Sequence, residues 1–233
     1  MAARDGKRGG KRVGRRGATV RVKTARGRKP SSTRWLQRQL NDPYVAAAAK
    51  QGYRSRAAWK LIEIDDRFGL LRPGARVLDL GAAPGGWTQV AAERAPGGVV
   101  VALDRVEMEP VAGAEVRTVD LDDDAAAEAL AGELAGRVDL VLSDMAIAAT
   151  GHRGTDQIRN RRLAELAYDV ARRVLRPGGG FVVKAFHGGG DADFVAELKR
   201  GFREVRSVKP AASRPESAEL YLVARGFRGG GEG

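Results

Sequence analysis

A glycine-rich turn placed directly after an apolar strand limits this chain to very few folds. Residues 77–80 predict a buried strand, and the turn Gly-Ala-Ala-Pro-Gly-Gly that follows leads into a helix. A second apolar run, residues 99–103, ends in the carboxylate Asp104, 23 positions after Gly81. In doubly wound α/β sheets, such a turn lets the backbone approach a nucleoside, while the acid binds ribose hydroxyls. The sequence therefore predicts an α/β fold with a site for an adenosine cofactor.

The spacing of the glycines decides between classes of adenosine cofactor. Dinucleotide-binding folds carry G-x-G-x-x-G, and nucleotide hydrolases with a phosphate loop carry G-x-x-x-x-G-K-[ST]. Neither string occurs here, because the glycines of the turn stand at positions 81, 85 and 86. A loop of the type acid-x-G-x-x-x-G, here Asp79, Gly81 and Gly85, suits a cofactor without phosphates. We therefore expect S-adenosylmethionine, and an ordinary βα turn is the alternative.

Composition sets limits on size, metal chemistry and location. The 233 residues can hold one α/β domain with a sizeable core, together with extensions. The chain has no Cys and only two His, so thiolate zinc sites and cysteine nucleophiles are excluded and no metal site is expected. No apolar run approaches the roughly 18 residues of a membrane span, and no signal-peptide core follows the N-terminus. We expect a cytoplasmic protein without a membrane segment.

The positive charge is concentrated at the N-terminal end. Residues 1–30 hold twelve Lys and Arg against one acid, Asp5, so this segment carries +11 of the chain's net charge of +12. It is rich in glycine and poor in apolar residues, and we expect a disordered tail because little surface is available to offset the entropy of ordering. A flexible polycation favours capture of nucleic acid, and a solubilising or targeting extension is the alternative. The glycine-rich residues 228–233 are expected to be flexible as well.

Three helices are expected between the tail and the glycine turn. Ser31, Ser32 and Thr33 predict the cap of a helix from about Arg34, and two more helices are expected at residues 44–50 and 57–68. Basic side chains in this region are close in sequence to Lys60 and could bind RNA phosphates. The residues expected to form this surface are Arg34, Arg38, Arg54 and Arg56.

Beyond Asp104, strands and helices alternate along the chain. We expect strands at 116–119, 138–142, 181–186, 203–208 and 218–225, helices at 123–136, 159–175 and 191–201, a loop at 145–158 and a turn at 176–180. The last two strands are joined by a short connection without a helix, and this favours antiparallel pairing. The prediction is a Rossmann-like, seven-stranded mixed sheet with the last strand antiparallel and helices on both faces.

Two charged residues stand where open α/β sheets place their active sites. Asp144 directly follows the fourth expected strand, at its carboxyl end. Lys184 lies inside the apolar fifth strand, where an unpaired charge is costly, so a partner is expected. Taken alone, Lys60 on its helix and Glu219 at the start of the last strand are more typical of solvated side chains. Glu219 shares one strand face with Tyr221.

Seven strings in this chain, in the same order, resemble the FtsJ/RrmJ family of ribose 2′-O-methyltransferases, and specifically its bacterial heat-shock enzymes. They are S-S-T-R-W-L-Q-R-Q, D-P-Y-V, G-Y-R-S-R-A-A-W-K-L, D-L-G-A-A-P-G-G-W-T-Q, L-S-D-M-A, L-R-P-G-G-G-F-V-V-K-A-F and S-R-P-E-S-A-E-L-Y-L-V-A. The resemblance implies a methyltransferase domain over residues 31–227, with an RNA-facing helical part at 31–73 and a core at 74–227.

The family carries a Lys-Asp-Lys-Glu tetrad, and matching the motifs assigns it to Lys60, Asp144, Lys184 and Glu219. The resemblance implies that Lys184 activates or orients the ribose 2′-hydroxyl. Lys60 and Glu219 would hold Lys184 and the ribose in place. Asp144 would connect the tetrad with the cofactor.

The resemblance also implies which residues contact each part of the cofactor. It implies that Gly85 and Trp87 lie at the methionine end, that Asp104 binds the ribose and that Asp120 meets the adenine amino group. Gly81 joins this set because it opens the turn. For Trp87, packing of its helix onto the sheet is the alternative.

The substrate implied by the resemblance is a uridine of 23S rRNA in the large ribosomal subunit, methylated by a monomer. Methylation of transfer RNA or of an RNA cap, and a non-catalytic RNA-binding role in ribosome assembly, are the alternatives. A lysine within a buried strand argues against the non-catalytic role, because a protein that only binds RNA does not need one. A nicotinamide-dependent oxidoreductase is excluded because the G-x-G-x-x-G string is absent. One departure concerns the loop after L-S-D-M-A, where bacterial relatives have Pro-Asn and this chain has Ile147-Ala148.

Overall fold

The computed structural model describes residues 20–21, 30–147, 150–186 and 191–229, and these contain one seven-stranded sheet. Its strands are β1 (Arg76–Leu80), β2 (Val99–Asp104), β3 (Glu115–Thr118), β4 (Val138–Ser143), β5 (Leu175–Phe186), β6 (Phe202–Val208) and β7 (Glu219–Phe227). They are arranged in the order β3-β2-β1-β4-β5-β7-β6. Only β7 is antiparallel to its neighbours, β5 and β6. The predicted mixed sheet with a reversed last strand is confirmed.

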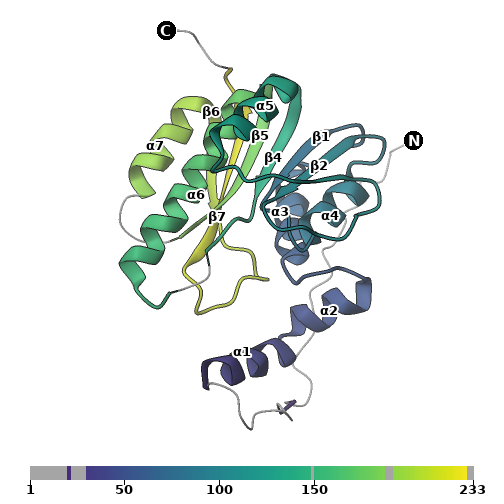
Figure 1. Ribbon diagram of the computed structural model, residues 1–233, viewed down its shortest axis with the longest axis vertical. Coiled ribbons are helices and arrows are strands. Elements are labelled where there is room, and N and C mark those ends of the chain that lie inside the picture. The colour runs from purple at the N-terminus through teal and green to yellow at the C-terminus, as the bar shows by residue number, and fades with distance from the viewer. Residues whose placement is uncertain (1–19, 22–29, 148–149, 187–190, 230–233) are drawn as a thin grey trace, which may run out of the picture.

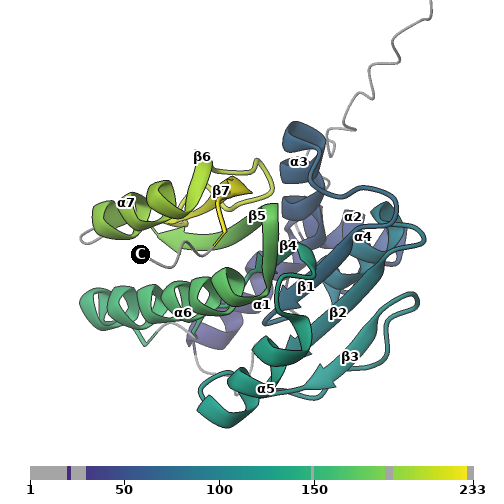
Figure 2. The same cartoon turned by 90° about the horizontal axis from the view of Figure 1, so that it is seen from above.

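Helices cover both faces of the sheet, as predicted (Figure 2). The described helices are α1 (Pro30–Leu40), α2 (Pro43–Gln51), α3 (Ala58–Phe68), α4 (Gly86–Arg94), α5 (Asp124–Leu134), α6 (Arg153–Val174) and α7 (Asp191–Gly201). One core cluster joins α5, α6 and α7 to the sheet, and a second joins α3 and α4 to its other face. Successive residues of a strand point to opposite faces, so Phe181 and Val183 of β5 enter the first cluster and Val182 enters the second.

Two helices begin several residues before the predicted start. α1 begins at Pro30, so Ser31 to Thr33 lie inside the helix rather than capping it. Proline suits a first helical position because its missing N–H would have no partner there. α6 begins at Arg153, not near residue 159, and the Asp156 carboxylate in its first turn accepts hydrogen bonds from Thr150 N and Oγ1. An acid at this end is favourable to the helix dipole.

The predicted turn at residues 176–180 is a bulge within β5. Val138 of β4 pairs with Leu175, but Leu140 already pairs with Gly180. The extra residues lie opposite a single residue of β4, and Gly178 among them has φ +83°. The glycines at this position interrupt the regular strand as predicted, but β5 already begins at Leu175.

The first two helices project from the body of the molecule and lie at the bottom of Figure 1. α2 is attached through a small cluster of Ala48, Trp59 of α3 and Ala212 from the segment between β6 and β7. No helix within the described ranges is long and apolar enough to cross a membrane. The predictions for residues 1–19, 22–29 and 230–233 lie outside the described residues.

Candidate active site

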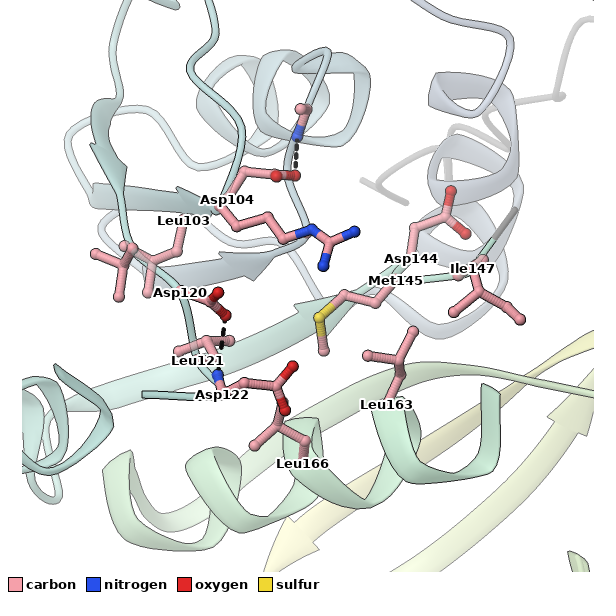
Figure 3. A pocket seen from close by; sticks show the side chains of 15 residues that line it. Leu103, Asp104, Asp120, Leu121, Asp122, Asp144, Met145, Ile147, Leu163 and Leu166 are labelled. Carbon is pink, nitrogen blue, oxygen red and sulfur yellow. Dashed lines mark hydrogen bonds between the residues drawn. The ribbon is translucent and has the colours of Figure 1, made fainter. Parts of the chain in front are cut away.

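The turn between β1 and α4 is held against the end of β2. Gly81 N and Ala82 N both donate to the carbonyl of Leu103, at 2.9 and 3.0 Å. The Asp104 carboxylate accepts a hydrogen bond from Ala83 N through Oδ2 at 2.9 Å (Figure 3). It accepts another from Val106 N through Oδ1, also at 2.9 Å. Gly81 and Gly85 have φ of +71° and +108°, a region that favours glycine. Asp104 therefore joins the loops after the two strands and keeps further lone pairs for a ligand.

A cavity of about 250 Å³ opens beside this turn. Its acidic lining residues are Asp104, Asp120, Asp122 and Asp144, and apolar walls come from Leu103, Leu121, Leu163 and Leu166 (Figure 3). An apolar slot with a few placed polar groups is typical of a small-molecule site. The concentration of carboxylates disfavours an anionic ligand and suits a neutral or cationic one.

The structure places four of the six predicted cofactor residues on the cavity wall, namely Gly81, Asp104, Asp120 and Asp144. Gly85 and Trp87 are not among the residues that line it. The Trp87 side chain is buried, its indole N–H donates to Ala57 O at 2.8 Å, and its ring lies 5.5 Å from that of Tyr221. This position fits the packing alternative, and its contact with a cofactor stays a prediction.

The four residues matched to the tetrad form two ion pairs. Lys60 Nζ lies 2.8 Å from Glu219 Oε1. Lys184 Nζ lies 2.6 Å from Asp144 Oδ1 and also donates to the main-chain carbonyl of Asp144 at 3.0 Å. Both lysine side chains keep less than a tenth of their surface exposed. Lys184 thus has the partner that its apolar surroundings require, and neither Lys60 nor Glu219 is the solvated side chain that each would be on its own.

Tyr221 links the two ion pairs into one network, a role that the sequence did not reveal. Its hydroxyl accepts a hydrogen bond from Lys60 Nζ at 3.1 Å and donates one to Asp144 Oδ1 at 2.6 Å. In the sheet, Tyr221 lies directly opposite Lys184. The one available signal was its two-residue spacing from Glu219, which puts both side chains on the same face of β7.

Electrostatics keep this network ionised at its carboxylates. Burial alone would raise the pKa of the Asp144 carboxyl, but Lys184 and Lys60 outweigh it and the pKa is lowered. Burial likewise opposes ionisation of Glu219, yet Lys60 lowers its pKa. Burial and the Asp144 and Glu219 charges raise the pKa of Tyr221 well above its ordinary value. The tyrosine therefore stays protonated and remains a donor to Asp144.

The arginines expected to bind RNA have different surroundings. Arg38 is exposed on α1, and the side chain of Arg34 lies outside the described residues. Arg56 forms an ion pair with Asp42 at 2.9 Å and donates to Ala212 O. Arg54 donates to three backbone carbonyls. Both of these guanidinium groups thus bond to other groups of the chain, Arg56 in a half-buried position and Arg54 in an exposed one.

The loop that departs from the bacterial pattern borders the cavity. Ile147 lines it, and Ile147 N donates to Asn160 Oδ1 of α6 at 3.1 Å. Ala148 lies outside the described residues. This backbone bond fixes the start of the loop even though Pro-Asn is absent.

A sheet of this order, with a glycine turn after β1 and an acid after β2, has the Rossmann-like architecture, in which the ligand site lies at the carboxyl ends of the parallel strands. Residues 53–227 match the FtsJ-like methyltransferase family, and the chain belongs to this family.

Curated relatives cover almost the whole chain. A Rhodospirillum rubrum protein is 57% identical over 232 residues, which are 97% of this chain and 88% of the relative. An Acidiphilium cryptum protein is 57% identical over 214 residues, which are 92% of this chain and 95% of the relative. Both are named ribosomal RNA large subunit methyltransferase E. A crystal structure from Plasmodium falciparum, described as a ribosomal RNA methyltransferase, is 28% identical with a TM-score of 0.66, covering 76% of this chain and all of that one.

Proposed function

We propose that this methyltransferase moves a methyl group from S-adenosylmethionine to a ribose 2′-hydroxyl in 23S rRNA of the large ribosomal subunit. The observation that carries the proposal is the network Glu219–Lys60–Tyr221–Asp144–Lys184, which reaches the cofactor cavity through Asp144. The relatives' names support the class of RNA, because they specify ribosomal RNA of the large subunit. Since that RNA is made and assembled in the cytoplasm of bacteria, we expect the protein to act there.

The cavity suits the proposed methyl donor. S-adenosylmethionine carries no phosphate, and it supplies a methyl group on a positively charged sulfur when bound. Asp104 would accept hydrogen bonds from the ribose hydroxyls, and Asp120 would accept one from the adenine amino group. The acidic lining favours this cation over the phosphate-bearing cofactors that the glycine spacing already argued against.

Lys184 is the residue that we assign to the acceptor hydroxyl. An ammonium has three N–H donors, and Asp144 takes two of them through its carboxylate and its carbonyl. The third is left for the 2′-oxygen, whose lone pair is then oriented for in-line attack. In its neutral form Lys184 accepts the hydroxyl proton instead. Lys60, held by Glu219 and Tyr221, fixes the position of the ribose.

The remaining regions are assigned to RNA capture. We propose that the helices of residues 31–73 face the RNA, with exposed Arg38 on α1 as a phosphate contact. The basic residues 1–30 would attach the protein to RNA without base specificity. The catalytic unit is proposed to be the monomer, because all five network residues come from one chain.

The test uses labelled S-adenosylmethionine and large subunits that lack the modification. Lys184→Met keeps the apolar stem in β5 but removes the ammonium, and we expect transfer to fall by about 10²- to 10⁴-fold. Lys199→Ala, on an exposed position of α7, is the matched control and should transfer at the wild-type rate. Subunit binding with no transfer by the wild type would instead favour an assembly factor, and an active Lys184→Met would refute the assigned role.

A further inference from the structure

Arg54 contacts two of the loops that border the cofactor cavity, those after β1 and β2, although its own side chain is exposed and is not part of the cavity wall. Nη1 donates to Pro84 O at 3.2 Å in the loop after β1. Nη1 also donates to Glu109 O, and Nη2 to Pro110 O, each at 2.6 Å in the loop after β2. A single guanidinium thus bridges two loops that are 25 residues apart in sequence.

The backbone that carries Arg54 is itself fixed to α4. Arg54 N donates to Gln89 Oε1 at 2.8 Å, and Gln89 Nε2 donates to Gly52 O at 2.9 Å. Next to it, the Tyr53 hydroxyl donates to Glu93 Oε2 at 2.7 Å. The side chain is therefore held at its base as well as at its tip, and less freedom is lost when its hydrogen bonds form.

Gly85 provides the room that this arrangement needs. A Cβ at position 85 would lie 3.0 Å from Arg54 Nη1 and 3.1 Å from Val111 Cγ2. The guanidinium and the loop after β2 close over the turn at this point. Gly85 thus has a steric function in addition to its φ of +108°.

We infer that Arg54 is a positioning residue that clamps the two cofactor loops together, and not a phosphate contact. The loops are joined on the cavity side by Asp104, which accepts from Ala83 N, and on the outer side by Arg54. Ala83, Asp104 and Arg105 of these loops line the cavity. Such a clamp favours cofactor binding, because the turn after β1 and Asp104 are held together before the cofactor binds. Less conformational entropy is then lost on binding. The inference rests on the proposed function for the identity of the ligand.

The test replaces the guanidinium of Arg54, which donates through two nitrogen atoms, with the single ammonium group of lysine. Arg54→Lys keeps the positive charge but cannot bond both loops, so we expect the Kd for S-adenosylhomocysteine, measured by calorimetry, to rise about tenfold. Amide hydrogen exchange in residues 83–86 and 106–112, measured without any ligand, should become faster. RNA affinity and its salt dependence should stay at the wild-type values. Arg38→Gln, on exposed α1, should give the reverse pattern, with weaker RNA binding and unchanged cofactor binding.

The outcomes separate the clamp from the proposed function. Unchanged Kd and unchanged exchange in Arg54→Lys would overturn the clamp, and so would a loss of RNA affinity with normal cofactor binding. If the wild type binds no S-adenosylhomocysteine, the proposed function fails, and the ligand-free exchange alone then decides on the clamp. Gln89→Ala is a second variant, for the case that Arg54→Lys does not fold. It removes only the acceptor of Arg54 N, so the Kd for S-adenosylhomocysteine and the amide exchange should both rise, but by less than in Arg54→Lys.

Discussion

At the level of single residues, Tyr221 connects the two ion pairs of the proposed catalytic network. Its hydroxyl supplies the hydrogen bonds that join the Lys60–Glu219 pair to the Lys184–Asp144 pair. The hydroxyl bonds a cation and an anion at once, and hydrogen bonds to charged groups contribute about 1.5–3 kcal/mol. We therefore regard the five residues as one unit.

Tyr221→Phe tests this interpretation. We expect kcat to fall by about ten- to a hundredfold, because Lys60 and Asp144 each lose a partner, while the affinity for cofactor stays unchanged. The matched control is Tyr168→Phe, which removes a hydroxyl from the core on the opposite face of the sheet. Single-turnover kinetics at saturating RNA would measure both variants. Equal rates for the two would show that Tyr221 only fills space.

Asp79 beneath the glycine turn predicts a pH dependence of stability. It is 1% exposed, Thr88 Oγ1 donates to its Oδ2 at 2.7 Å, and its Oδ1 has no partner among the described residues. Burial, with smaller contributions from the Asp144 and Asp104 charges, raises its pKa from 3.8 to about 7, against the opposing bond from Thr88. The folded state therefore holds a proton that the unfolded chain releases above about pH 4.

Protonation of the buried Asp79 carboxyl contributes to the free energy of unfolding. The contribution is complete below about pH 4 and is lost as the pH rises to about 7, by up to about 4 kcal/mol. Asp79→Asn removes the titration, so its free energy of unfolding should change less between pH 5 and pH 8 than that of the wild type. Urea unfolding at the two pH values measures the difference. Parallel pH profiles for the two proteins would contradict the assignment.

At the scale of elements, the turn between β1 and α4 gives a prediction with a built-in control. In Gly81→Ala, the new Cβ would lie 2.3 Å from Met145 Cγ, and Met145 lines the cavity. Gly97 has nearly the same φ, +73° against +71°, but nothing described lies within 4 Å of a Cβ there. Both substitutions add backbone strain of about 1–2 kcal/mol, but only the first displaces a cavity residue.

We expect both alanine variants to lower the melting temperature because both strain the backbone, and Gly81→Ala to lower it further because it also displaces Met145. Only Gly81→Ala should weaken binding of S-adenosylhomocysteine, by about tenfold or more. Calorimetric titration of the two proteins makes the comparison. Equal cofactor affinities would mean that Met145 moves aside without affecting the site.

The elements that could be predicted are those with local signals. Short apolar runs and turn glycines predicted the strands, and the short connection before β7 predicted its reversed direction. The start of α6 was missed because its first turn is polar and His152 makes no side-chain cap. The bridging role of Tyr221 was missed because it depends on a contact with Lys60, 161 residues away. For the same reason, the sequence does not reveal that Arg54 and Arg56 bond to backbone carbonyls at residues 109–110 and 212, and their contact with RNA stays a prediction.

At the scale of the whole molecule, charge is divided between a basic extension and a nearly neutral remainder. Residues 1–30 carry +11 of the total of +12. The logarithm of the RNA-binding constant falls linearly with the logarithm of the salt concentration, and the slope is proportional to the number of phosphates that the protein neutralises. The extension should therefore account for most of the salt-dependent part of RNA binding, while the network and the cavity account for transfer.

Removal of residues 1–29 leaves Pro30 at the start of α1 and tests this division. We expect weaker RNA binding, by about tenfold or more at low salt, and a shallower dependence of log K on log salt. The rate at saturating RNA should not change. An extension of equal length with Gln at every Lys and Arg position should behave like the truncation. An unchanged salt dependence would place the RNA-binding charge elsewhere in the chain.

Methyl transfer to a ribose is tested most directly by locating the transferred methyl group on the RNA. Alkali cleaves RNA by attack of the 2′-hydroxyl, so a 2′-O-methyl group leaves the adjacent linkage intact. After incubation of unmodified large subunits with the protein and methyl-labelled S-adenosylmethionine, we expect the label in an alkali-resistant dinucleotide. Label recovered in mononucleotides would mean methylation of a base, and would contradict the role assigned to the Lys184 network.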